Sequence, residues 1–294
     1  MKPVIRHFTK AIIITALLLL LTPTVVVAVV PKANPVPGGV AWVSLGHSSD
    51  KPQAYFGKNP VMVVPIPGKT DHWRAVTGIP LDTKPGQHQL RISRASGDSV
   101  VSFKIKNKKY KKQYLKIKNK RKVDPNPEDL KRILSEKEEI TASLAHWRDA
   151  PPSTEDFQIP VHGRLSSPFG LRRFFNQKPR KPHSGIDIAA PHGTPIVAPA
   201  AAVVLQTGDY FFNGNTVFLD HGNGLITMYC HMSRIDVKPG DTIERGQQIG
   251  AIGKTGRATG PHLHWGVSLN DARVDPGLFF DDIRKQVRRK HAKK

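Results

Sequence analysis

The chain opens with its longest apolar run, which lies behind a basic start. Residues 11–30 are apolar apart from three threonines and one proline, and three cations, Lys2, Arg6 and Lys10, precede them. A positive segment followed by such a run is typical of a secretory signal peptide or of an uncleaved anchor, since 20 residues just span a bilayer. We therefore predict that residues 1–33 are a signal peptide or membrane anchor. A buried core helix is the less favoured alternative.

Residues 34–123 alternate short apolar runs with Pro-Gly and Ser-Gly-Asp turn signals. Their spacing is typical of an all-β module. Near its end, Val101, Phe103 and Ile105 alternate with a serine and two lysines, as the residues of a half-buried strand do. We predict a small all-β domain over 34–123.

A helix is predicted from Pro125 to Arg148. Asn126 suits the N-cap and Pro127 the first helical position, and acidic residues follow near the positive helix end. Apolar residues recur at helical spacing, namely Leu130, Ile133, Leu134, Ile140, Leu144 and Trp147. A stretch rich in proline and polar residues comes next. Residues 124–159 are therefore expected to be a helix and linker that act as a spacer between two domains.

Residues 160–280 return to short apolar runs, separated by glycine-bearing turns, with no helical stripe. Strands are expected at 194–198, 203–206, 216–220, 225–230 and 262–269. The predicted fold class is mainly β, with a C-terminal antiparallel β-sheet domain preceded by the small all-β domain and the connecting helix. A basic tail, 281–294, follows.

Charge changes the picture of the N-terminal half. The chain has 45 lysines and arginines against 23 acidic residues, a formal net charge of +22, and eleven of the cations lie within residues 104–122. This segment is either a solvated hairpin face or a docking ribbon for an anionic surface. Because we expect export, an anionic envelope polymer is favoured as the partner over nucleic acid. The single cysteine, Cys230, excludes a disulfide framework and an all-thiolate metal site.

Candidate chemistry gathers in the last domain. His262 and His264 are two apart on an expected strand, so they share a face, and a compact pair, His183 and Asp187, lies elsewhere in the domain. Two imidazoles and one carboxylate suit zinc with an open fourth position. Between residues 160 and 279 the only glutamate is Glu244, in a polar turn. A general base beside the metal would therefore be a histidine or an aspartate.

Three segments carry a resemblance to a known family: 183–187 (HSGID), 221–231 (HGNGLITMYCH) and 255–264 (TGRATGPHLH). Together they resemble the lysostaphin-type (LytM-type) zinc metalloendopeptidases of bacterial cell walls, which are peptidoglycan hydrolases. The resemblance covers residues 160–280 and implies a zinc peptidase domain there. It implies one zinc per chain, with the ligands His183, Asp187 and His264, and a catalytic pair, His231 and His262. It also implies that loops 168–173 and 209–215 border the substrate groove.

The resemblance further implies a zinc-dependent endopeptidase that cleaves peptide cross-links in peptidoglycan, in the periplasm or cell envelope. Metal-activated water would be assisted by the two histidines, and a D,D-endopeptidase is favoured over glycine-bridge cleavage. The alternatives are a non-hydrolytic activator of a cell-wall amidase and an envelope-binding protein. Peptidoglycan is the expected partner, and residues 104–122 are expected to meet an anionic envelope surface. No nucleic acid is expected, and the membrane is met only through residues 11–30 if they stay uncleaved.

Three further features have more than one interpretation. Cys230 is interpreted as a structural core thiol rather than a fourth ligand. Arg172 and Arg173 either pair with a substrate carboxylate or cover the end of a strand. The N-terminal domain could also block the groove until it is displaced.

Overall fold

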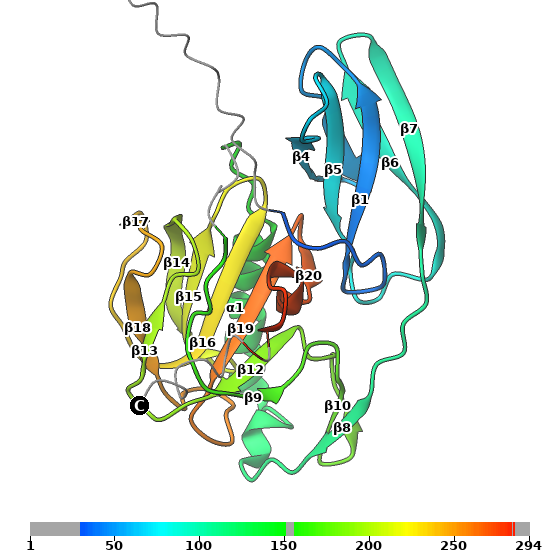
Figure 1. Cartoon of the computed structure of the whole chain (residues 1–294). Helices are drawn as coiled ribbons and strands as arrows, with labels where there is room; N and C mark the ends of the chain where they lie inside the picture. The colour runs from blue at the N-terminus through cyan, green and yellow to red at the C-terminus, as the bar shows by residue number, and fades with distance from the viewer. Residues whose placement is uncertain (1–29, 151–155, 284, 286–294) are drawn as a thin grey trace, which may run out of the picture.

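The fold is described from a computed structural model, which covers residues 30–150, 156–283 and 285 (Figure 1). The predicted signal or anchor over 1–33 lies outside the described residues up to position 29, and so does most of the predicted tail after Ile283. Within the described part of the chain, no helix is long and apolar enough to cross a membrane.

Two small sheets form the N-terminal part. One has the order β1 (Val40–His47), β5 (His72–Gly78), β4 (Met62–Pro65). The other has the order β3 (Asn59–Pro60), β2 (Gln53–Phe56), β6 (Gly86–Arg94), β7 (Gly97–Ile105). On β7 the expected alternation is confirmed, because Ile105 is buried and Val101 and Phe103 pack on the same cluster while Ser102 and Lys104 face solvent. The inner faces of both sheets supply this cluster.

A ten-stranded antiparallel sheet forms the C-terminal part. Its main path is β17 (Thr242–Ile243), β14 (Ala202–Tyr210), β15 (Gly214–Asp220), β16 (Leu225–Ile235), β19 (Leu263–Leu269), β12 (Gly185–Ala189), β9 (Arg164–Ser167). Beside it pair β13 (Pro195–Val197), β18 (Gln248–Ile252) and β20 (Ala272–Val274). Leu263, Trp265 and Val267 of β19 are fully buried in one cluster. The predicted fold class, mainly β with this antiparallel sheet, is confirmed.

The two parts share a core. Met62, Val64 and Val76 of the N-terminal sheet belong to the same buried cluster as Trp265. The 3-10 helix η2 (Pro276–Phe279) follows β20 and packs near the end of β19. The sheet of β1, β5 and β4 is therefore packed against the large sheet at this side (Figure 1).

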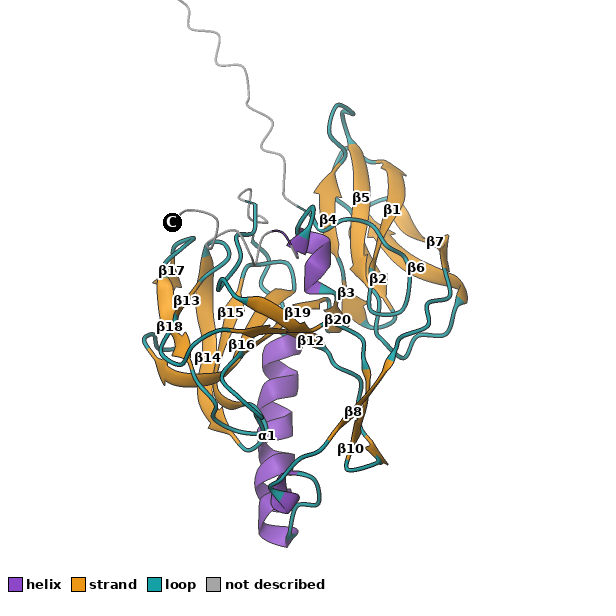
Figure 2. Cartoon of the chain, turned by 60° about the horizontal axis from the view of Figure 1, so that its bottom comes forward, coloured by secondary structure: helices purple, strands orange, loops and turns teal. Residues whose placement is uncertain are grey.

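Helix α1 (Pro127–Ala145) begins as predicted. Asn126 accepts a hydrogen bond from the Asp129 backbone and Pro127 occupies the first turn. The spacer prediction is wrong for the helix, because its C-terminal half packs on the large sheet through the fully buried Leu144 (Figure 2). The apolar stripe is also partly wrong, since Leu130 and Leu134 are exposed to 47% and 60%. Figure 2 shows the N-terminal half of α1 extending past the sheet.

The basic segment 104–122 does not form a hairpin. After β7 the chain crosses to the C-terminal part, where β8 (Lys112–Leu115) pairs in parallel with β10 (Arg172–Phe175), followed by β11 (Lys178–Pro179) (Figure 2). The 3-10 helix η1 (Lys120–Lys122) comes next. The hairpin interpretation is wrong because the partner strand lies about 60 positions further along the chain.

Candidate metal centre and active site

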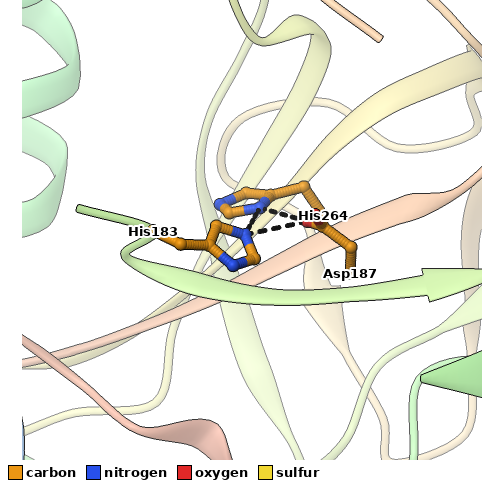
Figure 3. A group of neighbouring side chains, drawn as sticks. All are labelled: His183, Asp187 and His264. Atoms are coloured by element: carbon orange, nitrogen blue, oxygen red, sulfur yellow. Dashed lines mark hydrogen bonds and ion pairs between the residues drawn. The ribbon is translucent and has the colours of Figure 1, made fainter. Parts of the chain in front are cut away.

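Three predicted ligands meet at one point. Asp187 on β12 lies directly opposite His264 on the neighbouring strand β19, and His183 lies just before β12. The Oδ1 atom of Asp187 is 2.9 Å from Nε2 of His183 and 2.8 Å from Nδ1 of His264, and these two nitrogens are 3.0 Å apart. Figure 3 shows the three side chains turned toward one another. The strand register therefore brings the set together.

Protonation states at this point suit metal binding. Nδ1 of His183 donates to the carbonyl oxygen of Pro168 at 2.8 Å. The lone pair of Nε2 therefore faces Asp187 and His264. Burial lowers the pKa of His264 to about 4, so its ring is neutral near pH 7. Burial raises the pKa of the Asp187 carboxyl, but its close contacts with His183 and His264 outweigh this effect, and the pKa lies well below the usual value.

The donor set fits zinc. Zinc takes nitrogen and oxygen ligands at about 2.0–2.1 Å, which in a tetrahedron places neighbouring ligands about 3.3 Å apart. The three donor atoms are 2.8–3.0 Å from one another, so a small outward movement accommodates the ion. In the described part of the chain, this is the group of side chains that could hold a metal.

A glycine makes room for His264. Gly185 begins β12 and lies opposite Gly266 in the strand register. A Cβ atom at position 185 would lie 2.8 Å from Cε1 of His264 and 2.4 Å from the carbonyl oxygen of Trp265. Any side chain there would displace the imidazole or separate the strands, so glycine at 185 sets the position of the ligand.

The predicted catalytic pair lies beside the ligands. The rings of His231 and His262 are 4.8 Å apart, and the His231 ring is 6.3 Å from that of His264. Nδ1 of His231 donates to the carbonyl oxygen of Thr255 and Nδ1 of His262 to that of Gly260, each at 2.8 Å. In the neutral form of each ring Nε2 is then the acceptor, and that of His262 lies 3.9 Å from Oδ1 of Asp187.

His231 reaches this position through an irregular backbone. The register of β16 and β19 pairs Cys230 with His264, so regular alternation would point His231 to the opposite face. His231 instead has φ of +62°, at a register shift between β15 and β16. Such a conformation is uncommon for a residue with a side chain and is concentrated at functional sites. Burial lowers the pKa of His231 to about 3, with the charges of His262 and His264 acting in the same direction.

Comparison with known proteins agrees with this geometry. Residues 181–276 match the model of peptidase family M23, and residues 33–108 match that of the peptidase family M23 N-terminal domain. A crystal structure of a candidate M23 peptidase from Pseudomonas aeruginosa is 49% identical with a TM-score of 0.71, over 84% of this chain and 95% of that one. The chain belongs to peptidase family M23. The sequence resemblance to zinc metalloendopeptidases is thereby confirmed at the level of the family.

Curated relatives match this M23 peptidase over a shorter region. Peptidoglycan DD-endopeptidase ShyA of Vibrio cholerae is 47% identical over 103 residues, which are 35% of this chain and 24% of the relative. DD-carboxypeptidase/endopeptidase Mpg of Neisseria meningitidis is 42% identical over 116 residues, which are 40% of this chain and 27% of the relative. The chain thus spans about a quarter of the length of these relatives.

One contact at the candidate metal site was not predicted from the sequence. Nη2 of Arg173 donates to Oδ2 of Asp187 at 2.7 Å, so this arginine pairs with a predicted ligand of its own chain. Neither of the two earlier interpretations, a substrate carboxylate or the cover of a strand end, describes this contact. Arg172 is exposed on β10. A register between β10 and the metal-site strands could not be deduced from the sequence.

Loop 209–215, which is predicted to border the substrate groove, is contacted by residues that precede the matched peptidase segment. The backbone N–H of Phe211 donates to Glu136 of α1 at 2.7 Å, and the carbonyl oxygen of Phe211 accepts from Lys122 at 2.5 Å. Arg132 donates to the carbonyl oxygen of Asp209 at 2.7 Å. On the other side of the loop, the Arg257 guanidinium lies 4.2 Å from the Phe212 ring centre. Helix α1 and η1 thus hold this loop in place.

Cys230 lies in the core of this M23 peptidase, as predicted. Its side chain is 1% exposed and packs in an apolar cluster with Leu144 and Phe218. Burial raises the pKa of the thiol to about 12. A neutral, enclosed thiol is neither a good nucleophile nor a zinc ligand.

Proposed function

We propose that this protein is a zinc-dependent endopeptidase that cleaves peptide cross-links in peptidoglycan. The observation that carries the proposal is the convergence of five side chains. His183, Asp187 and His264 offer three donor atoms at one point, and the rings of His231 and His262 lie beside it, each with Nδ1 bonded to a backbone carbonyl. Two neutral imidazoles and one carboxylate leave a zinc site with a net charge of +1.

Each residue then has a defined role in the proposed reaction. Bound zinc would act as a Lewis acid that polarises a peptide carbonyl and makes water a better nucleophile. The buried, neutral His231 can accept the proton of the attacking water. Burial disfavours the charged form of this ring, but the anion that forms nearby during the reaction would stabilise it. His262 faces the same space and can donate or accept the second proton and stabilise the oxyanion.

D,D-endopeptidase activity is the specificity that we favour. Its support is the 47% identity to a protein named peptidoglycan DD-endopeptidase and the 42% identity to one named DD-carboxypeptidase/endopeptidase. We also propose action in the periplasm or cell envelope, with residues 1–33 directing export, and a peptidase domain over 160–280 that follows the all-β domain 34–123 and the 124–159 helix and linker. The basic tail, residues 281–294, is the last segment of this proposed domain organisation.

Digestion of purified sacculi tests the proposal. The chain from residue 30 onward is incubated with sacculi, and the soluble muropeptides are measured by mass. We expect loss of cross-linked dimers with a matching gain of monomers, abolished by a chelator and by His183→Ala. His192→Ala, which changes an exposed histidine of the same part, is the matched control and should cut normally. Unchanged muropeptides with one zinc per chain would contradict the endopeptidase and favour the amidase-activator alternative.

Residues 104–122 are proposed to dock on an anionic envelope polymer. Eight lysines of the segment are exposed and lie outside every ion pair of the described residues, namely Lys104, Lys106, Lys109, Lys111, Lys112, Lys116, Lys118 and Lys120. Their charges are therefore available to a partner. Because β8 pairs with β10, a polymer bound here would lie beside the strand that contacts the metal site.

Sedimentation with sacculi tests the docking proposal in a His231→Ala background, which prevents digestion. Replacement of Lys109, Lys111 and Lys116 by glutamine should weaken binding and reduce its dependence on salt. A control with the same loss of charge replaces Lys58, Lys69 and Lys84, which are exposed in the loops between the N-terminal strands. Equal loss of binding in both variants would mean that net charge, and not this segment, drives association.

A further inference from the structure

The two oxygens of the Asp187 carboxylate have separate partners. Oδ1 lies between the two ligand imidazoles, 2.9 Å from Nε2 of His183 and 2.8 Å from Nδ1 of His264. Oδ2 accepts the hydrogen bond from Nη2 of Arg173 at 2.7 Å. Both side chains of this ion pair are largely buried, with 18% of Arg173 and 10% of Asp187 exposed. A buried, charge-assisted bond of this kind holds one oxygen away from the cluster.

Because the two carboxylate oxygens have separate partners, they affect how many coordination positions of a bound metal stay free. A carboxylate can bind a metal through one oxygen or through both. A catalytic zinc site needs three protein donors and an open fourth position. If both oxygens of Asp187 reached the ion, together with His183 and His264, the protein would fill the fourth position and water could bind only as a fifth ligand. A partner that occupies Oδ2 prevents this.

Arg173 is itself held by a strand from the basic segment. Nε of Arg173 donates to Oε1 of Gln113 at 3.2 Å, and Nη2 also donates to Oγ of Ser167 at 3.2 Å. Gln113 on β8 lies directly opposite Arg173 on β10 in the parallel register. The next pair in that register, Tyr114 and Phe174, stacks with ring centres 4.7 Å apart. The contact that orients the guanidinium therefore comes from outside the matched segment 181–276.

We propose that Arg173, oriented by Gln113 of β8, is a positioning residue that restricts Asp187 to a single metal-binding oxygen and so keeps the fourth position of the metal open. The inference rests on the metal site of the proposed function but not on its substrate. It extends the active site to the basic segment, because β8 supplies the contact that fixes the arginine. Arg173 acts through Asp187 and needs no contact with substrate.

Cobalt substitution tests the proposal on the chain from residue 30 onward. Co²⁺ replaces zinc in such sites, and its visible absorption is strong for four-coordinate and weak for five-coordinate ions. The wild type should bind one Co²⁺ with strong absorption. Arg173→Met, which has similar length and no donor, should lose most of that absorption while still binding one ion. Arg173→Lys, which keeps a charged donor, should restore it.

Gln113→Ala provides the milder second variant, which serves if Arg173→Met does not fold. It should shift the absorption in the same direction by a smaller amount, because Arg173 keeps its bond to Ser167. Gln89→Ala, an exposed strand glutamine on β6, is the matched control and should leave the spectrum unchanged. A wild-type spectrum in both Arg173→Met and Gln113→Ala would overturn this inference. Failure of the wild type to bind cobalt would overturn the metal site of the proposed function instead.

Discussion

The side-chain amide of Asn270 pairs with both backbone groups of Gly78. Oδ1 of Asn270 accepts from the Gly78 N–H at 2.6 Å, and Nδ2 donates to the Gly78 carbonyl oxygen at 3.1 Å, with both bonds buried. Gly78 also lies so close to the large sheet that a Cβ there would be 2.4 Å from the carbonyl oxygen of Leu269. This contact joins the N-terminal sheets to the C-terminal part across 192 positions.

Removing that amide should destabilise the protein. Asn270→Gly leaves the two buried groups of Gly78 without a partner and adds no strain at φ of +47°, where glycine is at ease. The expected loss is about 2 kcal/mol in the free energy of unfolding, measured by urea denaturation. Asn107→Gly, at an exposed position between β7 and β8, is the control. A loss of less than about 0.5 kcal/mol, the usual range for surface substitutions, would mean that the interface does not depend on this pair.

The catalytic pair and the ligands should separate experimentally. His231→Ala and His262→Ala should each retain one zinc per chain and lower the turnover of cross-linked muropeptides by about 10²- to 10⁴-fold, the range for lost general acid–base catalysis. Metal content and turnover are measured on the same preparation. If His262→Ala loses its zinc, the assignment of His262 to catalysis is wrong.

Gly185→Ala should weaken metal binding without touching a ligand. The new methyl group would lie 2.8 Å from the His264 ring and 2.4 Å from a backbone oxygen, so the imidazole must move. We expect a loss in zinc affinity of about tenfold or more, as when supporting contacts of a metal ligand are removed. Competition with a fluorescent chelator measures it. Gly260→Ala, where no atom lies within 4 Å of the new Cβ, should keep the wild-type affinity.

The burial of His221 predicts that the free energy of unfolding depends on pH for a reason separate from the metal site. It is fully buried, donates through Nδ1 to the Ala201 carbonyl and accepts at Nε2 from Thr227, and burial lowers its pKa from 6.5 to about 4. Below pH 6.5 the unfolded chain binds a proton that the folded chain does not, so stability falls as the pH drops from 6.5 to 4. The contribution is about 3 kcal/mol.

His221→Gln should remove that contribution. The wild type should lose about 3 kcal/mol more than the variant between pH 7 and pH 4, as determined from denaturant unfolding at each pH. At pH 7 and above, where the histidine is neutral in both states, the difference between the two proteins should not change with pH. Parallel stability curves throughout the acid range would show that His221 titrates normally in the fold.

The sequence was informative where a local pattern decides the structure. Asn126 and Pro127 start α1, and Val101 and Phe103 alternate on β7 as expected. His262 and His264 were correctly placed on one face, because the buried Leu263 between them follows from period-two alternation.

The sequence did not predict features that depend on contacts between distant parts of the chain. Leu130 and Leu134 have helical spacing, but only tertiary packing determines how far the sheet extends beneath α1. The turn of His231 toward the ligands depends on one positive φ angle, which no residue type in the segment signals. The bond between Arg173 and Asp187 depends on where β10 lies, and β10 is positioned by a strand from another part of the chain.

The parallel pairing of β8 with β10 has a consequence for the order of folding. The three ligands lie on or beside strands of the ten-stranded sheet, whereas Gln113 reaches Arg173 within the separate three-stranded sheet of β8, β10 and β11. A chain whose ten-stranded sheet has formed while β8 is still undocked therefore already has its three ligands in place. Metal capture and completion of the site are in this way two separate steps in the maturation of the protein.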